Sequence, residues 1–296
     1  MKKGILIFLL LIVCMESYAQ FGDSSFGLQY PILGNPATTG MSPETEVFVG
    51  YRDQWSGFEG APRRMHAGIQ GRLNQKSGVG AIVHSRNWGI FDDVGANLYY
   101  SHKLNLGNNQ RLRLGLSTHL LQRSINDNRL DVNNLEADMV LTQNYSDDMN
   151  LQFNFGMLYQ WKDLTVGLAF PSIYEGGSQS MLSNKNILVM YDFHVLSEKI
   201  ILRPGLQFNR NNLMKNQQVL TLQALWKKTI WVQAGYNSIG GPIISTGLQY
   251  EKIGVNYGYD MNQGELGGLA VGSHEVMLTY KFSKKKESDD SDKVPF

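Results

Sequence analysis

The chain has 296 residues, enough for one large all-β domain or two ordinary ones, and its formal net charge of +1 gives no electrostatic basis for nucleic-acid binding. Hydrophobic residues make up 42% and charged residues 18%, the latter below the roughly 25% of soluble domains. With a mean hydropathy of −0.26, the chain is too polar for a helical membrane protein. The mixture suits a β-barrel, whose strands show one face to lipid and the other to water.

Residues 1–19 predict a cleavable signal peptide, with Lys2 and Lys3 before an apolar run that is too short to span a membrane as a helix. We expect the signal to direct export and to be cleaved after Ala19, so that the mature chain begins at Gln20. The only cysteine, Cys14, lies inside this segment, so we expect no disulfide and no thiol chemistry in the mature chain. A lipoprotein signal that carries its lipid on Cys14 is the alternative interpretation.

Residues 20–44 show no sustained strand pattern, although they carry the aromatic residues Phe21, Phe26 and Tyr30. Because this segment precedes the first strand, it is long enough either to plug the lumen of a barrel or to stand as a periplasmic docking piece. Both positions remain open from the sequence.

From residue 45 onward apolar and polar residues alternate, as in 65–73, 151–160 and 274–282. Successive side chains of a strand point to opposite faces, so each run predicts a strand with two different faces. The predicted strands are 45–53, 64–73, 78–86, 94–104, 110–121, 149–160, 163–170, 186–196, 200–209, 217–227, 229–237, 243–250, 253–260 and 273–282. The fold class is therefore all-β, an antiparallel outer-membrane β-barrel of about fourteen strands over 45–282.

The connections between these strands alternate between short polar turns and longer segments, the longer ones being 54–63, 87–93, 122–148, 171–185, 210–216, 238–242 and 261–272. Outer-membrane barrels have tight periplasmic turns and larger extracellular loops, and an even strand count places both termini in the periplasm.

The strands of a soluble β-sandwich also alternate between apolar and polar residues, but they are usually shorter. Aromatic residues such as Trp161, Trp226 and Tyr250 further favour a membrane interface. Residues 283–296 predict a disordered periplasmic tail.

The candidate inner face carries charges of both signs among many Asn and Gln, including Arg52, Arg86, Arg113 and Glu275. Such charges either pair with one another or line a water-filled pore. The six histidines fall on six separate strands without a pair at metal-ligand spacing, so no metal site is predicted. No nucleophile elbow and no phosphate-binding loop is present, so we predict neither catalytic residues nor a cofactor.

Several motifs resemble the PorP/SprF family of type IX secretion system membrane proteins from Bacteroidetes. They are Gln29-Tyr30, Asn35-Pro36-Ala37 with Gly40, Tyr51-Arg52-Asp53-Gln54-Trp55, Gly60-Ala61-Pro62, residues 254–260, and the closing strand from Ser273-His274-Glu275. The resemblance spans essentially the whole mature chain. It implies a non-enzymatic outer-membrane barrel linked to type IX secretion, which anchors or assists a secreted cargo or adhesin, or the periplasmic machinery of secretion and gliding. Its partner would be a secreted cargo or adhesin with a C-terminal secretion domain, or the periplasmic type IX components.

A channel for a small solute is the alternative function. If the barrel anchors a protein partner, the candidate binding residues lie in the loop after the first strand and in the N-terminal segment. In both places aromatic residues lie on a backbone whose conformation is restricted by Gly and Pro. They are Tyr51, Arg52, Gln54, Trp55, Phe58, Gly60, Ala61, Pro62, Asn35 and Pro36.

Overall fold

The computed structural model describes residues 24–126, 149–175, 184–195, 199–211, 214–261 and 271–282. Two short 3-10 helices, η1 (Pro31–Leu33) and η2 (Pro36–Thr38), precede the strands. The strand segments are β1 (Thr45–Asp53), β2 (Arg63–Arg72), β3 (Ser77–Trp88), β4 (Phe91–Gly107), β5 (Gln110–Ile125), β6 (Met149–Trp161), β7 (Leu164–Glu175), β8 (Lys185–Tyr191), β9 (Phe193–Val195), β10 (Ile200–Asn211), β11 (Met214–Trp226), β12 (Ile230–Asn237), β13 (Gly241–Tyr250), β14 (Ile253–Asp260) and β15 (Ser273–Phe282). No helix among the described residues is long and apolar enough to cross a membrane.

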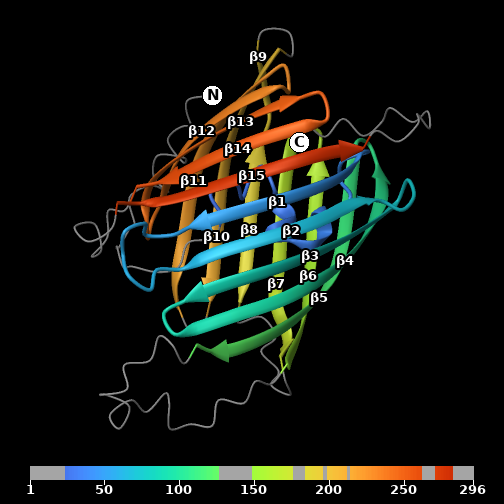
Figure 1. Ribbon diagram of the computed structural model, residues 1–296. Helices are drawn as coiled ribbons and strands as arrows, with labels where there is room; N and C mark the ends of the chain where they lie inside the picture. Colours follow the sequence, from blue (N-terminus) through green and yellow to red (C-terminus); the bar gives the residue numbers. More distant parts are fainter. Residues whose placement is uncertain are drawn as a thin grey trace, which may run out of the picture.

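Neighbouring strands pair antiparallel, and β15 pairs with β1, so the sheet closes on itself (Figure 1). Both β8 and β9 pair with β10, as two parts of one strand interrupted at Asp192. The barrel therefore has fourteen strands, as the sequence predicted. Pro204 lies beside the interruption, and the neighbouring Arg203 donates to Asp192 over 2.6 Å.

The two faces of the wall differ as the alternation requires. Outward residues are apolar and exposed, for example Leu98 at 62% and Leu116 at 54%. Inward residues are polar and buried, for example Ser101 and Gln223, both at 0%. This pattern gives lipid an apolar outer surface and turns the polar atoms to the lumen.

The two ends of the barrel also differ. The short-turn end has tight connections at 73–76, 108–109, 162–163, 196–199, 227–229 and 251–252, and the long-loop end carries 54–62, 126–148, 176–184 and 261–272. Three connections predicted to be long are short. They are 89–90, 212–213 and 238–240, because the flanking strands continue pairing beyond the predicted limits. In the first of these hairpins the two strands are joined beyond the predicted limits by the Arg86–Asp93 ion pair and by contact of the tilted Trp88 and Phe91 rings.

Aromatic residues mark the membrane interface at the short-turn end, where Trp161, Trp226 and Tyr250 are 45%, 50% and 70% exposed. The ammonium groups of Lys162 and Lys227 lie 5.8 Å and 5.2 Å from the centres of the preceding Trp rings. Aromatic rings followed by lysines are typical of the boundary between hydrocarbon and headgroups.

Residues 24–41 lie inside the barrel, where the blue segment is visible behind β1 and β2 in Figure 1. Phe26, Tyr30 and Ile32 from this segment form one buried apolar cluster with residues of the wall. The wall residues are Phe48, Ile82, Tyr99, Ile201, Leu225, Trp231 and Met277, which come from β1, β3, β4, β10, β11, β12 and β15. The core therefore joins opposite sides of the lumen through the N-terminal segment.

Candidate functional site

The N-terminal segment is fixed to the wall by a turn that the sequence motif Asn35-Pro36-Ala37 builds. The Asn35 side chain accepts from the Ala37 N–H over 2.9 Å and donates to the carbonyl of Met157 over 3.1 Å. Asn35 thus caps η2, and Pro36 fills the first helical position, where no N–H is needed. Gly115 of β5 and Gly156 of β6 face this turn, and a Cβ at either position would collide with it. The motif and the two glycines form one packed unit.

A buried ion-pair group holds the other end of the segment. Arg52 bonds Asp260 and lies 3.0 Å from Glu275, with all three side chains at 13% exposure or less. Glu275 accepts from the Ser24 hydroxyl over 2.6 Å and from the Ser25 N–H over 2.7 Å. The pairing of the buried charges and the anchoring of the segment therefore use the same carboxylate.

Tyr30 lies between these two contacts along the segment. Its hydroxyl accepts a hydrogen bond of 3.0 Å from Asn256, which also contacts Trp231 of β12. Burial raises the pKa of Tyr30 above its ordinary value, so the phenol stays protonated.

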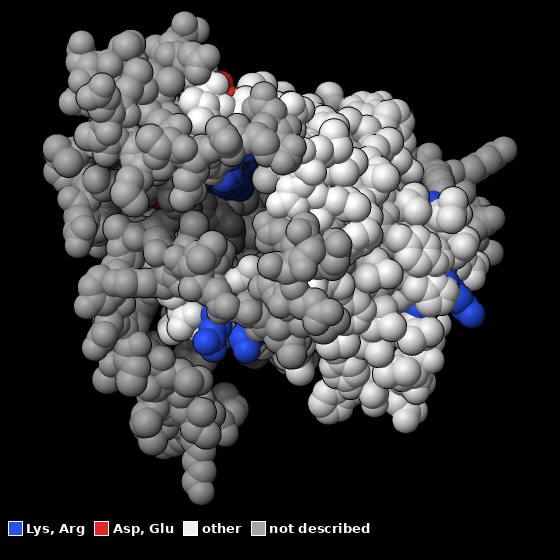
Figure 2. All heavy atoms as spheres, turned by 90° about the horizontal axis from the view of Figure 1, so that it is seen from below, with Lys and Arg blue, Asp and Glu red and all other residues white. Residues whose placement is uncertain are grey.

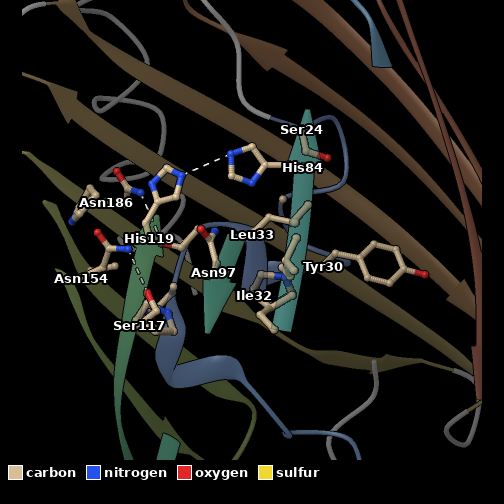
Figure 3. A pocket seen from close by; sticks show the side chains of 18 of the residues that line it. Ser24, Tyr30, Ile32, Leu33, His84, Asn97, Ser117, His119, Asn154 and Asn186 are labelled. Carbon is tan, nitrogen blue, oxygen red and sulfur yellow. Dashed lines mark hydrogen bonds between the residues drawn. The ribbon is translucent and has the colours of Figure 1, made fainter. Parts of the chain in front are cut away.

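A cavity of about 370 Å³ lies beside the segment, toward the long-loop end. Figure 3 shows its wall, where the Nε2 atoms of His84 and His119 are 3.3 Å apart and Asn154 donates to Ser117 over 3.0 Å. Its lining is rich in amides and imidazoles: His66, His84, Asn97, His119, Gln152, Asn154, Asn186, Gln207 and Asn209. His66, His84 and His119 face the lumen.

The loop 54–62 at the rim is held in place from two sides. The Ser56 N–H donates to the Gly272 carbonyl over 2.7 Å, the Val271 N–H donates back over 3.0 Å, and the Gly89 N–H donates to the Gly60 carbonyl over 2.8 Å. Trp55 has a φ of 53°, a left-handed conformation that is costly for a bulky residue. The backbone of the loop is therefore fixed, and the loop presents Phe58, which is 41% exposed.

The structure divides the predicted partner-binding residues into two groups. Arg52, Gln54, Asn35 and Pro36 are buried in the lumen or at the loop base, and Pro62 closes the loop by accepting from the Gln54 N–H over 2.9 Å. Tyr51 faces outward from β1, and Trp55, Phe58, Gly60 and Ala61 lie at the rim. Only the rim residues can touch a partner while the N-terminal segment is in place. Partner binding itself stays a prediction.

The sequence did not indicate which inward charges would become neighbours. In the register of β1 to β5, Arg52 lies opposite Arg64, Arg64 opposite Arg86, Arg86 opposite Asp93, and Asp93 opposite Arg123. We call these five residues the arginine row. The alternation placed Arg52 and Arg86 on the inner face, but only the register brings all five residues to one level.

These features define an outer-membrane β-barrel whose lumen is crossed by its own N-terminal segment. Among solved structures, the chain is similar to the CymD monoaromatic hydrocarbon channel, with a TM-score of 0.53, 10% identity, and coverage of 91% of this chain and 95% of that one. It is also similar to the outer membrane protein Omp33 of Acinetobacter baumannii, with a TM-score of 0.50, 7% identity, and coverage of 82% and 100%. At such identities the likeness shows the fold alone. A comparison with curated protein sequences found no match.

The family model of the type IX secretion system membrane protein PorP/SprF matches residues 24–280. The chain belongs to this family, as its motifs indicated, and its location is the outer membrane.

Proposed function

We propose that this barrel works as an anchor in type IX secretion, which fixes a protein partner in the outer membrane and does not pass a solute. The observation that carries the proposal is the apolar cluster of Phe26, Tyr30 and Ile32 with opposite walls of the lumen. Apolar side chains packed across a lumen exclude the continuous water column that a porin needs. The proposed role is therefore structural and not enzymatic.

The partner surface that fits this role is the rim loop 54–62. Exposed aromatic side chains on a fixed backbone bind partners with little loss of conformational entropy. Phe58 is exposed, and the backbone of its loop is bonded to the two flanking connections at Gly272 and Gly89. With the short turns in the periplasm, this loop lies at the cell surface, where it can contact a secreted cargo.

The experiment is retention of the secreted cargo by cells that produce the Trp55→Ala, Phe58→Ala double variant. The matched control is Tyr250→Ala, an aromatic residue at the opposite end of the barrel that is more exposed than Phe58. After abundance and heat-modifiable folding are shown to be normal, we expect cargo to be lost to the medium only in the double variant. Wild-type retention by the folded double variant would remove the rim loop from the proposal.

The alternative, a small-solute channel, takes its support from the cavity at the long-loop end. Two of the similar structures are named as monoaromatic hydrocarbon channels. For this chain a channel requires movement of residues 24–41, because their buried contacts cross the lumen.

A further inference from the structure

We propose that His84 and His119 bind a divalent transition-metal ion such as Zn²⁺ in the wall of the cavity at the long-loop end. The sequence predicted no metal site, because the two histidines lie 35 residues apart on separate strands. The register of β3, β4 and β5 brings them together, and their Nε2 atoms face each other at 3.3 Å (Figure 3). This site is independent of the proposed anchor function.

The separation of the two Nε2 atoms fits a shared metal ion. Imidazole nitrogens bind Zn²⁺ at about 2.0–2.1 Å in a tetrahedral arrangement, which places two such nitrogens about 3.3–3.4 Å apart. A direct hydrogen bond between the rings is the other explanation of the contact. Hydrogen bonds from N–H groups to oxygen are most often about 2.9–3.0 Å long, so the distance between the two rings is long for such a bond. The observed 3.3 Å agrees better with two ligands of one ion.

Neighbouring residues place both rings for this role. Gln152 of β6 lies opposite His119, and its Oε1 is 3.3 Å from His119 Nδ1. An oxygen acceptor at Nδ1 keeps the proton there and leaves Nε2 as the metal-binding atom, which is the usual arrangement around a metal-bound histidine. The His84 ring lies over Gly95 of β4, where a Cβ would collide with it. The missing side chain at Gly95 therefore lets His84 reach toward β5.

Asn97 is the third candidate ligand. It lies opposite His119 and is the next residue after Gly95 on the inner face of β4. Its Nδ2 donates to the Tyr99 hydroxyl over 2.9 Å, while its buried Oδ1 has no hydrogen-bond partner among the described residues. An unpaired buried oxygen costs free energy, which a bound cation recovers. In the part of the chain that the structure describes, no three His, Cys, Asp or Glu side chains gather at one point, so an amide oxygen completes the set.

The ligand atoms select the kind of ion. Imidazole suits Zn²⁺, Ni²⁺ and Cu²⁺, whereas Mg²⁺ and Ca²⁺ prefer oxygen ligands. The arginine row lies one inward position away, with Arg86 next after His84 on the inner face of β3. Its arginines repel a cation, so the zinc affinity should be below that of a closed structural zinc site.

A metal ion can reach these side chains through the cavity. His84, Asn97 and His119 all line it. The face of the molecule seen in Figure 2 is hollowed, and side chains of Lys or Arg lie within the hollow. Both imidazoles are partly exposed, so the remaining coordination positions of the ion stay open to water.

Binding is measured by titration calorimetry on the full mature chain in detergent, without a histidine tag, using zinc chloride and magnesium chloride. We expect one equivalent of Zn²⁺ to bind, and Mg²⁺ not to bind at the same concentrations. His84→Gln and His119→Gln should each weaken the zinc affinity by about tenfold or more, since even the loss of a residue that hydrogen-bonds a metal ligand costs that much. The matched control is His102→Gln on the outer face of β4, which should leave the affinity unchanged.

X-ray absorption at the zinc edge identifies the ligands in the unaltered protein, so the test does not depend on the folding of a variant. The zinc complex should show two imidazole nitrogens at about 2.0–2.1 Å. Absence of zinc binding, equal affinity for Zn²⁺ and Mg²⁺, fewer than two imidazole ligands, or full zinc affinity in a folded His84 or His119 variant overturns the proposal. The two rings would then share a hydrogen bond only.

Discussion

Arg52 joins the N-terminal segment to the strands that close the barrel. It bonds Asp260 of β14 and Glu275 of β15, and its guanidinium donates to the Ser25 hydroxyl over 2.7 Å. The two carboxylates are 13% and 1% exposed, so this part of the lumen folds only if a cation pairs with them.

Replacing Arg52 with leucine should therefore destabilise the barrel strongly. The change leaves two buried carboxylates without their cation, which costs about 3–5 kcal/mol. Arg63→Leu removes an ion pair that is 66% and 26% exposed, so its cost should be about 0–1 kcal/mol. Urea unfolding of the two variants in detergent measures both values. Similar stabilities of the two variants would mean that Arg52 does not hold the N-terminal segment to the strands that close the barrel.

Single residues were also where sequence reasoning was least complete. Alternation placed Arg52 and Glu275 on the inner face, but Asn35 and Pro36 were assigned to a partner surface although they are buried. Residues 24–41 form short 3-10 turns without a period. Nothing local indicates which of their side chains are enclosed, because burial there depends on the surrounding wall.

Strands and turns were predictable because one face of each strand meets lipid. Lipid-facing positions must be apolar along the whole span, so the period of two is strong and the strand count follows. The positions at which the strands end are less predictable from the sequence. Beyond the apolar span, pairing of β3 with β4 continues to Trp88 and Phe91 through polar contacts that follow no alternation.

A charge placed on the lipid-facing side should destabilise the barrel more, the deeper the position lies in the bilayer. Leu116, which pairs with Tyr100 in the middle of the hairpin, and Leu106, beside the tight turn, are both 54% exposed. Leu116→Arg should cost roughly 2–4 kcal/mol and Leu106→Arg roughly 0–1 kcal/mol. Folding yield into lipid vesicles at increasing urea tests this difference. Equal costs at the two depths would argue against a membrane-spanning hairpin.

The turn at Asn35 should keep its position only while the two facing glycines, Gly115 and Gly156, lack side chains. A valine at Gly115 collides with Pro36 and Ala37, so it should displace the N-terminal segment from the lumen. The readout is maleimide labelling of a Thr39→Cys thiol, since Thr39 is fully buried and Cys14, the only native cysteine, lies in the predicted signal peptide. Labelling should rise in the Gly115→Val background and stay low with Ser117→Val, the next inward position. Protection of the thiol in both backgrounds would contradict this arrangement.

For the whole molecule, the unequal ends predict the orientation. The short-turn end should face the periplasm, and the connections 126–148 and 176–184 the cell surface. Epitope tags at residues 130 and 178 should be detected on intact cells, and tags at Lys162-Asp163 or Lys227-Lys228 only after permeabilisation. Surface detection of the short-turn tags would reverse the orientation, and with it the position of the rim loop.

The filled lumen is the central claim about the whole molecule. Phe26, Tyr30 and Ile32 contact opposite walls of the lumen, so we expect the segment and not the wall to set the permeability. A closed lumen agrees with the proposed anchor.

Single-channel conductance in a planar bilayer tests this claim most directly. The full mature chain should show no resolvable steps, and the same chain without residues 24–41 should conduct as an open barrel of fourteen strands. Heat-modifiable folding of both proteins is the control for insertion. Open-barrel conductance by the full mature chain, equal to that of the truncated chain, would contradict a lumen closed by its N-terminal segment.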